Sequence, residues 1–153
     1  MTASTTDRIE QQVFLRAPRA RVWQALTDWR AFGQWFGVVL DGPFRPGGHV
    51  NAAVTTAGYE HVRFDIQVQE IVPEQVFSWR WHPHAIDPAR DYSSEPTTLV
   101  VFRLEDAPGG TLLKVVESGF DGVPLARRLE AYRGNSGGWA QQMKSIERYV
   151  SAG

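Results

Sequence analysis

Apolar and polar residues alternate one by one along several stretches of the chain, the pattern of half-buried β-strands. The clearest stretch is 62–69, where Val62, Phe64, Ile66 and Val68 alternate with polar residues. The same pattern predicts further strands at 9–17, 38–40, 49–55, 76–82, 97–104 and 111–120. Turn residues, mainly Pro, Gly and Asp, separate these stretches. The first four-fifths of the chain are therefore dominated by an antiparallel sheet.

Helical spacing of apolar residues appears in three places. Residues 18–27 begin with Pro18, which suits the first turn of a helix, and 29–37 predict a second short helix. After Pro124, one long amphipathic helix is predicted from an apolar stripe made of Leu125, Leu129, Tyr132, Trp139, Met143, Ile146 and Val150. Gly137 and Gly138 interrupt it, and each costs about 1 kcal/mol relative to alanine, so a close backbone approach or a bend is expected there.

These elements predict an α+β helix-grip architecture. A curved antiparallel sheet of about six to seven strands would wrap around the long C-terminal helix, with the two short helices after the first strand. Residues 1–153 would form one domain, in which 1–7 are a flexible polar tail. The stretch 83–96 contains three prolines and no periodicity, so it is a long loop. A long helix packed against a strongly curved sheet leaves a cavity between them, and that cavity is the candidate ligand-binding site.

Composition narrows the classes of partner. The net charge of -1 gives no reason to expect nucleic acid or an anionic membrane, and no stretch has the length of a membrane helix. Without cysteine there is no disulfide, no thiolate nucleophile and no cysteine-bound zinc. The N-terminus lacks the features of a signal peptide, which predicts a cytoplasmic location. The exposed edge of the sheet is compatible with a monomer or a weak homodimer.

Aromatic residues make up 12% of the chain, enough to build a cavity wall. Phe77, Trp79 and Trp81 share one face of a strand, where they would either stack on a ligand or only pack on the long helix. Tyr92 in the long loop would gate the site or anchor the loop. The candidate ligand-binding residues are Trp35, Phe36, Phe64, Phe77, Trp79, Trp81, Tyr92, Val115, Glu117, Trp139 and Met143.

Glu117 is the candidate with the most distinctive chemistry. It shares the strand phase of Leu113 and Val115, so its carboxylate should face the interior, where it needs a partner. Arg63, Arg80, His82 or a ligand hydroxyl are the candidates, and a structural salt bridge is favoured. Asn135 and Trp139 share one face of the long helix, and Asn135 would bond a strand or a ligand.

Recognisable catalytic and cofactor motifs are absent from the sequence. His82 and His84 flank Pro83, but further metal ligands cannot be placed, so no metal is expected. No serine lies in a Gly-x-Ser-x-Gly elbow, and no glycine-rich segment matches a nucleotide fingerprint. No catalytic residue and no cofactor are therefore assigned, although a cyclase or hydratase in which Glu117 and His82 transfer protons is an alternative.

Several short segments, in order, resemble homologues of the activator of the heat-shock protein 90 ATPase, within the START-like (SRPBCC) superfamily that includes polyketide cyclases and the birch pollen allergen. They are Ala17-Pro18, Val22–Thr27, Gln34–Phe36, Phe77–Trp81, Gly110-Thr111, Glu117–Phe120 and Asn135–Trp139. The resemblance implies a helix-grip fold with a hydrophobic ligand cavity. The expected partner is a small apolar or aromatic molecule, lipid-, polyketide- or flavonoid-like. A chaperone-associated, stress-related interaction module is the alternative.

Overall fold

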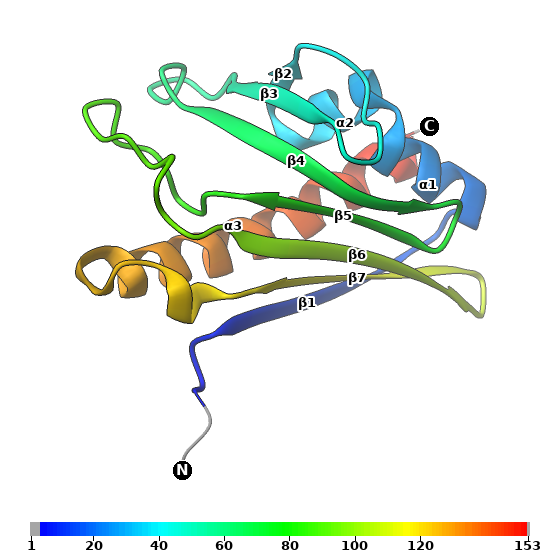
Figure 1. The fold of residues 1–153 in the computed structure, drawn as a ribbon. Coiled ribbons are helices and arrows are strands. Elements are labelled where there is room, and N and C mark those ends of the chain that lie inside the picture. Colours follow the sequence, from blue (N-terminus) through cyan, green and yellow to red (C-terminus); the bar gives the residue numbers. More distant parts are fainter. Residues whose placement is uncertain (1–3, 153) are drawn as a thin grey trace.

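A curved antiparallel sheet of seven strands wraps around the long helix α3 (Leu125–Ala152), as Figure 1 shows. The computed structural model describes residues 4–152. The strands are β1 (Arg8–Leu15), β2 (Val38–Leu40), β3 (His49–Val54), β4 (Arg63–Val72), β5 (Val76–Trp81), β6 (Thr98–Ala107) and β7 (Gly110–Ser118), in the spatial order β1-β7-β6-β5-β4-β3-β2. Helices α1 (Arg19–Thr27) and α2 (Trp29–Phe36) connect β1 to β2. The predicted helix-grip fold is confirmed.

Strands β2 to β7 form a meander in which each strand pairs with the next along the chain, and β1 joins the sheet as an edge strand by pairing with β7. Ile9 thereby lies opposite Glu117. Strand β6 runs three residues beyond its predicted end at 104, because the connection to β7 is a tight turn rather than a longer loop. Gly109 makes that turn possible with a φ of 83°, and Ala107 already pairs with Gly110.

The caps of α2 fix where its aromatic face lies. The side chain of Asp28 accepts hydrogen bonds from the backbone N–H groups of Arg30 and Ala31, at 3.0 and 3.1 Å. At the other end Gly37 adopts the left-handed conformation with a φ of 85°, which terminates the helix directly after Phe36. The helix therefore presents Phe36 to the interior at its last turn.

Helix α3 differs from its prediction in two respects. Its predicted apolar stripe is buried only in the C-terminal part of the helix. In the first turns Leu125 and Leu129 are 79% and 51% exposed, and Arg127 is buried instead. The helix also continues through Gly137 and Gly138, and a Cβ at either would have nothing within 4 Å. The predicted close backbone approach at these glycines is therefore wrong. It occurs instead at Gly134, where a Cβ would lie 2.6 Å from the His84 ring.

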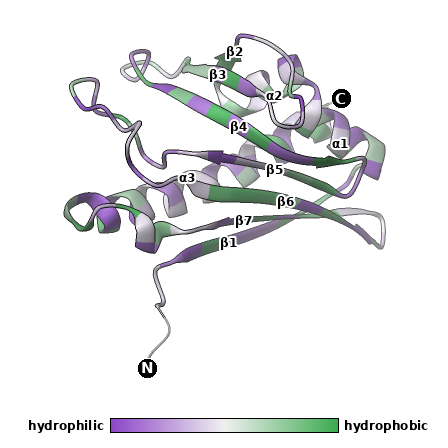
Figure 2. Ribbon diagram, viewed as in Figure 1, coloured by the Kyte–Doolittle hydropathy of each residue, from purple (hydrophilic) through white to green (hydrophobic). Residues whose placement is uncertain are grey.

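Hydrophobic and hydrophilic residues alternate along the strands, as Figure 2 shows for β4. The inward residues form a core rich in aromatic rings, and Phe77, Trp79 and Phe102 in it are fully buried. Rings therefore fill most of the space that the sheet and helix enclose. Within residues 4–152, no helix is long and apolar enough to cross a membrane.

Hydrogen bonds fix the backbone of Asp7, just before β1, to the segment that follows β7. The backbone carbonyl of Asp7 accepts hydrogen bonds from the N–H groups of Gly119 and Phe120, both at 3.1 Å. Of the predicted flexible tail 1–7, residues 1–3 lie outside the described residues. The single domain over 1–153 and its tail remain predictions.

Candidate functional site

A fully buried carboxylate lies where the sheet meets α3. Oε1 of Glu117 accepts hydrogen bonds from Nδ2 of Asn135 at 2.9 Å and Nε1 of Trp139 at 2.8 Å. Its Oε2 accepts from Nε1 of Trp81 at 2.7 Å and Oγ1 of Thr98 at 2.6 Å. One side chain thus joins β5, β6, β7 and α3.

These contacts explain how the chain tolerates an acidic group in its core. Indole N–H and amide N–H groups only donate, so three of the four contacts of Glu117 have an unambiguous direction. A buried carboxylate is costly unless hydrogen bonds replace those it made with water. Four neutral side chains provide that replacement here, and no Lys, Arg or His of residues 4–152 contacts the carboxylate.

The predicted ionic partners of Glu117 are wrong. Arg80 and His82 lie in the opposite strand phase to Trp81, so they cannot reach the interior carboxylate. Nε2 of His82 instead contacts the backbone carbonyl of Glu95 at 2.9 Å. Arg63 is exposed on the outer face of β4. The structure therefore does not bring Glu117 and His82 together as a proton-transfer pair.

A small pocket opens beside this carboxylate, between β4, β5 and α3. Its volume is about 160 Å³, and its lining consists of Phe36, Phe64, Trp81, Asn135, Gly138, Trp139 and Gln142. The ring centroids of Phe64 and Trp81 lie 5.0 Å apart, and those of Trp81 and Trp139 lie 6.1 Å apart. The rings thus form one continuous aromatic wall.

Gly138 and Gln142 shape the rest of the pocket from α3. A Cβ on Gly138 would meet nothing within 4 Å, so the missing side chain leaves space on the pocket side of the helix. Nε2 of Gln142 donates to the backbone carbonyl of Phe36 at 2.9 Å, which ties α3 to the end of α2. No charged side chain belongs to the described lining of this pocket.

The predicted site residues separate into distinct groups. Phe36, Phe64, Trp81 and Trp139 line the pocket, and Glu117 lies directly behind it. The core holds the remaining interior candidates, which are Trp35, Phe77, Trp79, Val115 and Met143. Nε1 of Trp35 donates to the Ala25 carbonyl at 2.7 Å, whereas Nε1 of Trp79 has no partner in the described part of the chain. Asn135 bonds Glu117 of β7, which is one of its two predicted partners, whereas no sequence pattern indicated Gln142.

A second hollow, of about 350 Å³, lies between β4 and the long loop. Strands β4 and β5 pair only from Gln67 onward, and Figure 1 shows them diverging toward that loop. Residues of the loop cover the gap, among them Tyr92. Phe64 lines both hollows, so this ring alone is common to the two.

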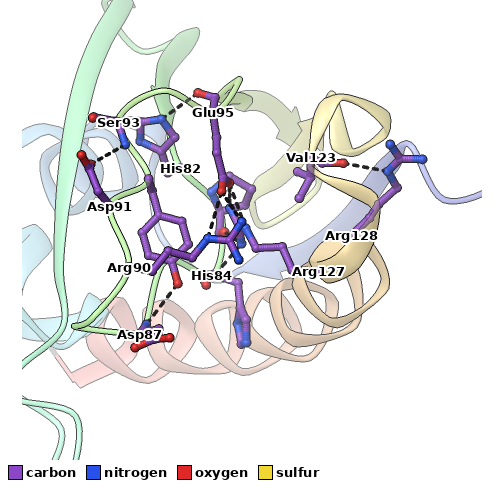
Figure 3. A network of polar contacts seen from close by, with 12 residues as sticks. His82, His84, Asp87, Arg90, Asp91, Ser93, Glu95, Val123, Arg127 and Arg128 are labelled. Carbon is purple, nitrogen blue, oxygen red and sulfur yellow. Dashed lines mark hydrogen bonds and ion pairs between the residues drawn. The ribbon is translucent and has the colours of Figure 1, made fainter.

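The long loop is fastened to α3 by a buried ion pair, shown in Figure 3. Nη2 of Arg127 lies 2.7 Å from Oε1 of Glu95, and both side chains are 8% exposed. Arg90 pairs with the other oxygen of Glu95 at 2.7 Å, and Nη1 of Arg127 donates to the Pro83 carbonyl at 2.8 Å. Burial opposes ionisation of Glu95, but the hydrogen bonds from Arg127 and Arg90 outweigh it and hold its pKa below the ordinary value.

Tyr92 belongs to this anchor. The guanidinium of Arg127 stacks over its ring at 4.6 Å, and its hydroxyl accepts a hydrogen bond from the backbone N–H of Asp87 at 3.2 Å. Hydrogen bonds from the backbone and side chain of Ser93 likewise lower the pKa of Asp91 within a local turn. The pairing of Glu95 with Arg127 could not be predicted from the sequence, because the two residues lie on different elements without a shared periodicity.

Histidines do not gather into a metal site. Over residues 4–152, no group of three or more His, Cys, Asp or Glu residues is arranged to hold a metal ion. His84 lies 3.6 Å from Glu130, and His49 lies 3.0 Å from Asp65, in separate parts of the molecule.

Comparison with known proteins identifies the family. The model of the family described as activator of Hsp90 ATPase homolog 1-like protein matches residues 16–151. The chain belongs to this family. No relative was found among curated protein sequences.

Solved structures share the fold of this family member. DynU16, described as a putative protein in the dynemicin biosynthetic locus, is 26% identical with a TM-score of 0.73; the match covers 95% of this chain and 47% of DynU16. The chain thus spans about half the length of DynU16. Protein MLL2253 from Mesorhizobium loti is 24% identical with a TM-score of 0.75, covering 95% and 97% of the two chains. The Aha1 dimer from Colwellia psychrerythraea is 17% identical with a TM-score of 0.68, covering 94% and 95%.

Proposed function

We propose that this chain binds a small molecule by inserting a flat aromatic ring into the pocket between β4, β5 and α3. The observation that carries the proposal is the pocket itself, in which Phe36, Phe64, Trp81 and Trp139 form one wall and Gly138 leaves room opposite. Stacked or edge-to-face ring contacts add about 0.5–1.5 kcal/mol per pair beyond burial of apolar surface. The description of DynU16 as a putative protein in a biosynthetic locus supports a small-molecule ligand.

The size of the pocket limits what can enter. A volume of about 160 Å³ is close to the ~150 Å³ cavity that accommodates one benzene ring. One ring of a larger ligand would therefore insert, while the rest lies outside along α3. This geometry favours aromatic, flavonoid- or polyketide-like molecules over the long chain of a lipid.

The state of Glu117 favours binding over catalysis. Both of its oxygens are engaged by four protein donors, so neither is directed at a reacting group in the pocket. A general base must lie within hydrogen-bond reach of the proton that it removes. We therefore infer a binding protein rather than a cyclase or hydratase. A chaperone partner, a role in stress response and a cytoplasmic location remain predictions.

Two neighbouring glycines provide a matched test. Gly138 lines the pocket and Gly137 does not, and neither has a neighbour that a new side chain would strike at its Cβ. Binding of naphthalene and its derivatives would be measured by calorimetry and by shifts of the indole N–H signals in NMR spectra. We expect Gly138→Leu to abolish binding and Gly137→Leu to retain it. Equal binding by both variants, with both folded, would place the ligand elsewhere.

A further inference from the structure

The orientation of Asn135 is determined by its neighbour. The Glu117 carboxylate is an acceptor, so the side chain of Asn135 must turn its NH2 group toward it, as the 2.9 Å contact of Nδ2 shows. The Oδ1 atom of Asn135 consequently has to point elsewhere. It accepts no hydrogen bond from any described residue, and Asn135 lines the pocket.

Gln142 is constrained in the same way. Its NH2 group donates to the backbone carbonyl of Phe36, which can only accept. The Oε1 atom of Gln142 is therefore also left without a donor among the described residues, and Gln142 lines the same pocket. Asn135 and Gln142 are two helical turns apart, so they lie on one face of α3, about 10 Å apart along its axis.

The charge around the pocket is unfavourable for an anion. Among the described residues, the lining contains no Lys, Arg or His. The Glu117 carboxylate is close by, because it accepts hydrogen bonds from the lining residues Trp81, Trp139 and Asn135. A ligand carboxylate would lose its hydration without gaining a cation, and it would face two amide oxygens. A hydroxyl would instead donate to one of those oxygens.

We propose that the ligand of this pocket is a hydroxylated aromatic compound, uncharged at the inserted end, whose hydroxyl groups donate to Gln142 Oε1 and Asn135 Oδ1. The proposal rests on the proposed function and narrows it, because it excludes fatty acids and aromatic carboxylates. The two acceptors are separated along the helix, so a fused-ring compound with hydroxyls at opposite ends would engage both.

Three probes with the same ring system separate these possibilities. Calorimetric titration would compare naphthol, methoxynaphthalene and naphthoate substituted at the same ring position. Naphthol can donate a hydrogen bond, its methyl ether cannot, and naphthoate is an anion. We expect naphthol to bind about tenfold more tightly than the ether, the effect of one hydrogen bond, and naphthoate to bind most weakly.

A pair of variants on α3 locates the acceptor. Gln142→Leu removes Oε1, and Gln141→Leu makes the same change at an exposed neighbour outside the pocket. The readout is the ratio of naphthol to ether affinity within each variant, because changes in pocket shape affect both probes alike. We expect the ratio to fall at least threefold in Gln142→Leu and to stay unchanged in Gln141→Leu.

The outcomes distinguish the two levels of the proposal. If none of the three probes binds the wild-type chain, the proposed function itself fails. If all bind but the ether matches naphthol, or naphthoate binds most tightly, the aromatic pocket stands and the hydroxyl assignment is overturned. A ratio that survives Gln142→Leu unchanged would overturn the assignment of Gln142 as an acceptor.

Discussion

Two tryptophans on one strand allow the hydrogen bonding of the buried carboxylate to be measured. Trp79 and Trp81 are 0% and 5% exposed and both pack against Trp139, but only Trp81 donates to Glu117. Nε1 of Trp79 is buried without a partner in the described structure. Replacing either indole by phenyl removes a similar volume from the core, so the packing losses of Trp79→Phe and Trp81→Phe cancel to first order in a comparison.

The difference between the variants follows from the two N–H groups. Trp81→Phe loses a hydrogen bond to a carboxylate, which contributes about 1.5–3 kcal/mol. Trp79→Phe removes an unsatisfied buried donor and so regains about 1–3 kcal/mol of its desolvation cost. We therefore expect Trp81→Phe to lower the free energy of unfolding by about 3 kcal/mol more than Trp79→Phe, which corresponds to a further drop in melting temperature of about 6–12 °C.

Urea denaturation followed by circular dichroism would measure both free energies, with unchanged denaturant slopes as the check that the denatured states are comparable. Equal losses in the two variants would refute the reasoning. That result would mean that the contact between Trp81 and Glu117 contributes nothing beyond packing.

Two further predictions concern the contact between the long loop and α3. The pKa of Glu95 is held below its ordinary value of 4.5, so its stabilising contribution is complete above pH 4.5 and is lost as pH falls through the lower folded value. Glu95→Gln should therefore lower the free energy of unfolding by about 3 kcal/mol at neutral pH, because it leaves Arg127 buried without its counter-charge. The difference from wild type should shrink in acid, where Glu95 of the wild type is protonated. A difference that stays constant across a pH series of urea denaturations would contradict this. Gly134→Ala should destabilise the chain because its Cβ would meet the His84 ring, whereas Gly137→Ala should stabilise it by about 1 kcal/mol; thermal melts that rank the two in the opposite order would disprove the close approach.

The inward placement of Glu117 could be predicted because strand phase depends only on local alternation. Its partners could not, since they depend on which strands are neighbours and in which register. Trp81 lies opposite Thr98 across β5 and β6, and Val100 lies opposite Glu117 across β6 and β7. The same alternation places Arg80 and His82 in the outward phase, opposite to Trp81. The prediction that either residue pairs with Glu117 was therefore inconsistent with the strand pattern itself.

How completely side chains fill the space between the sheet and α3 could not be predicted from the sequence either. A count of aromatic residues predicts large rings inside, but whether they leave a cavity depends on their mutual packing. The rings of Phe32 and Phe36 stack at 4.6 Å, and Phe77 packs at 4.9 Å from Phe44, so most of the volume is occupied by side chains from α2 and the turn after β2. Beside α3, the end near Gly138 remains open as the pocket of about 160 Å³. Helical periodicity likewise predicts an apolar stripe, but it cannot show that Leu125 and Leu129 are exposed to solvent.

The pairing of β1 with β7 has a consequence for how the chain is made. The ribosome synthesises β1 well before its partner residues 110–118, because β2 to β6 lie between the two strands in the chain. Strands β2 to β6 can pair one after another during that interval, while β1 has no partner strand. The polar residues Glu10, Gln11 and Gln12 keep the unpaired β1 hydrated and disfavour its pairing with the strand edges of other chains. The addition of β1 to the sheet, and with it the docking of α3 beside β1, is thus postponed until β7 and α3 have been synthesised.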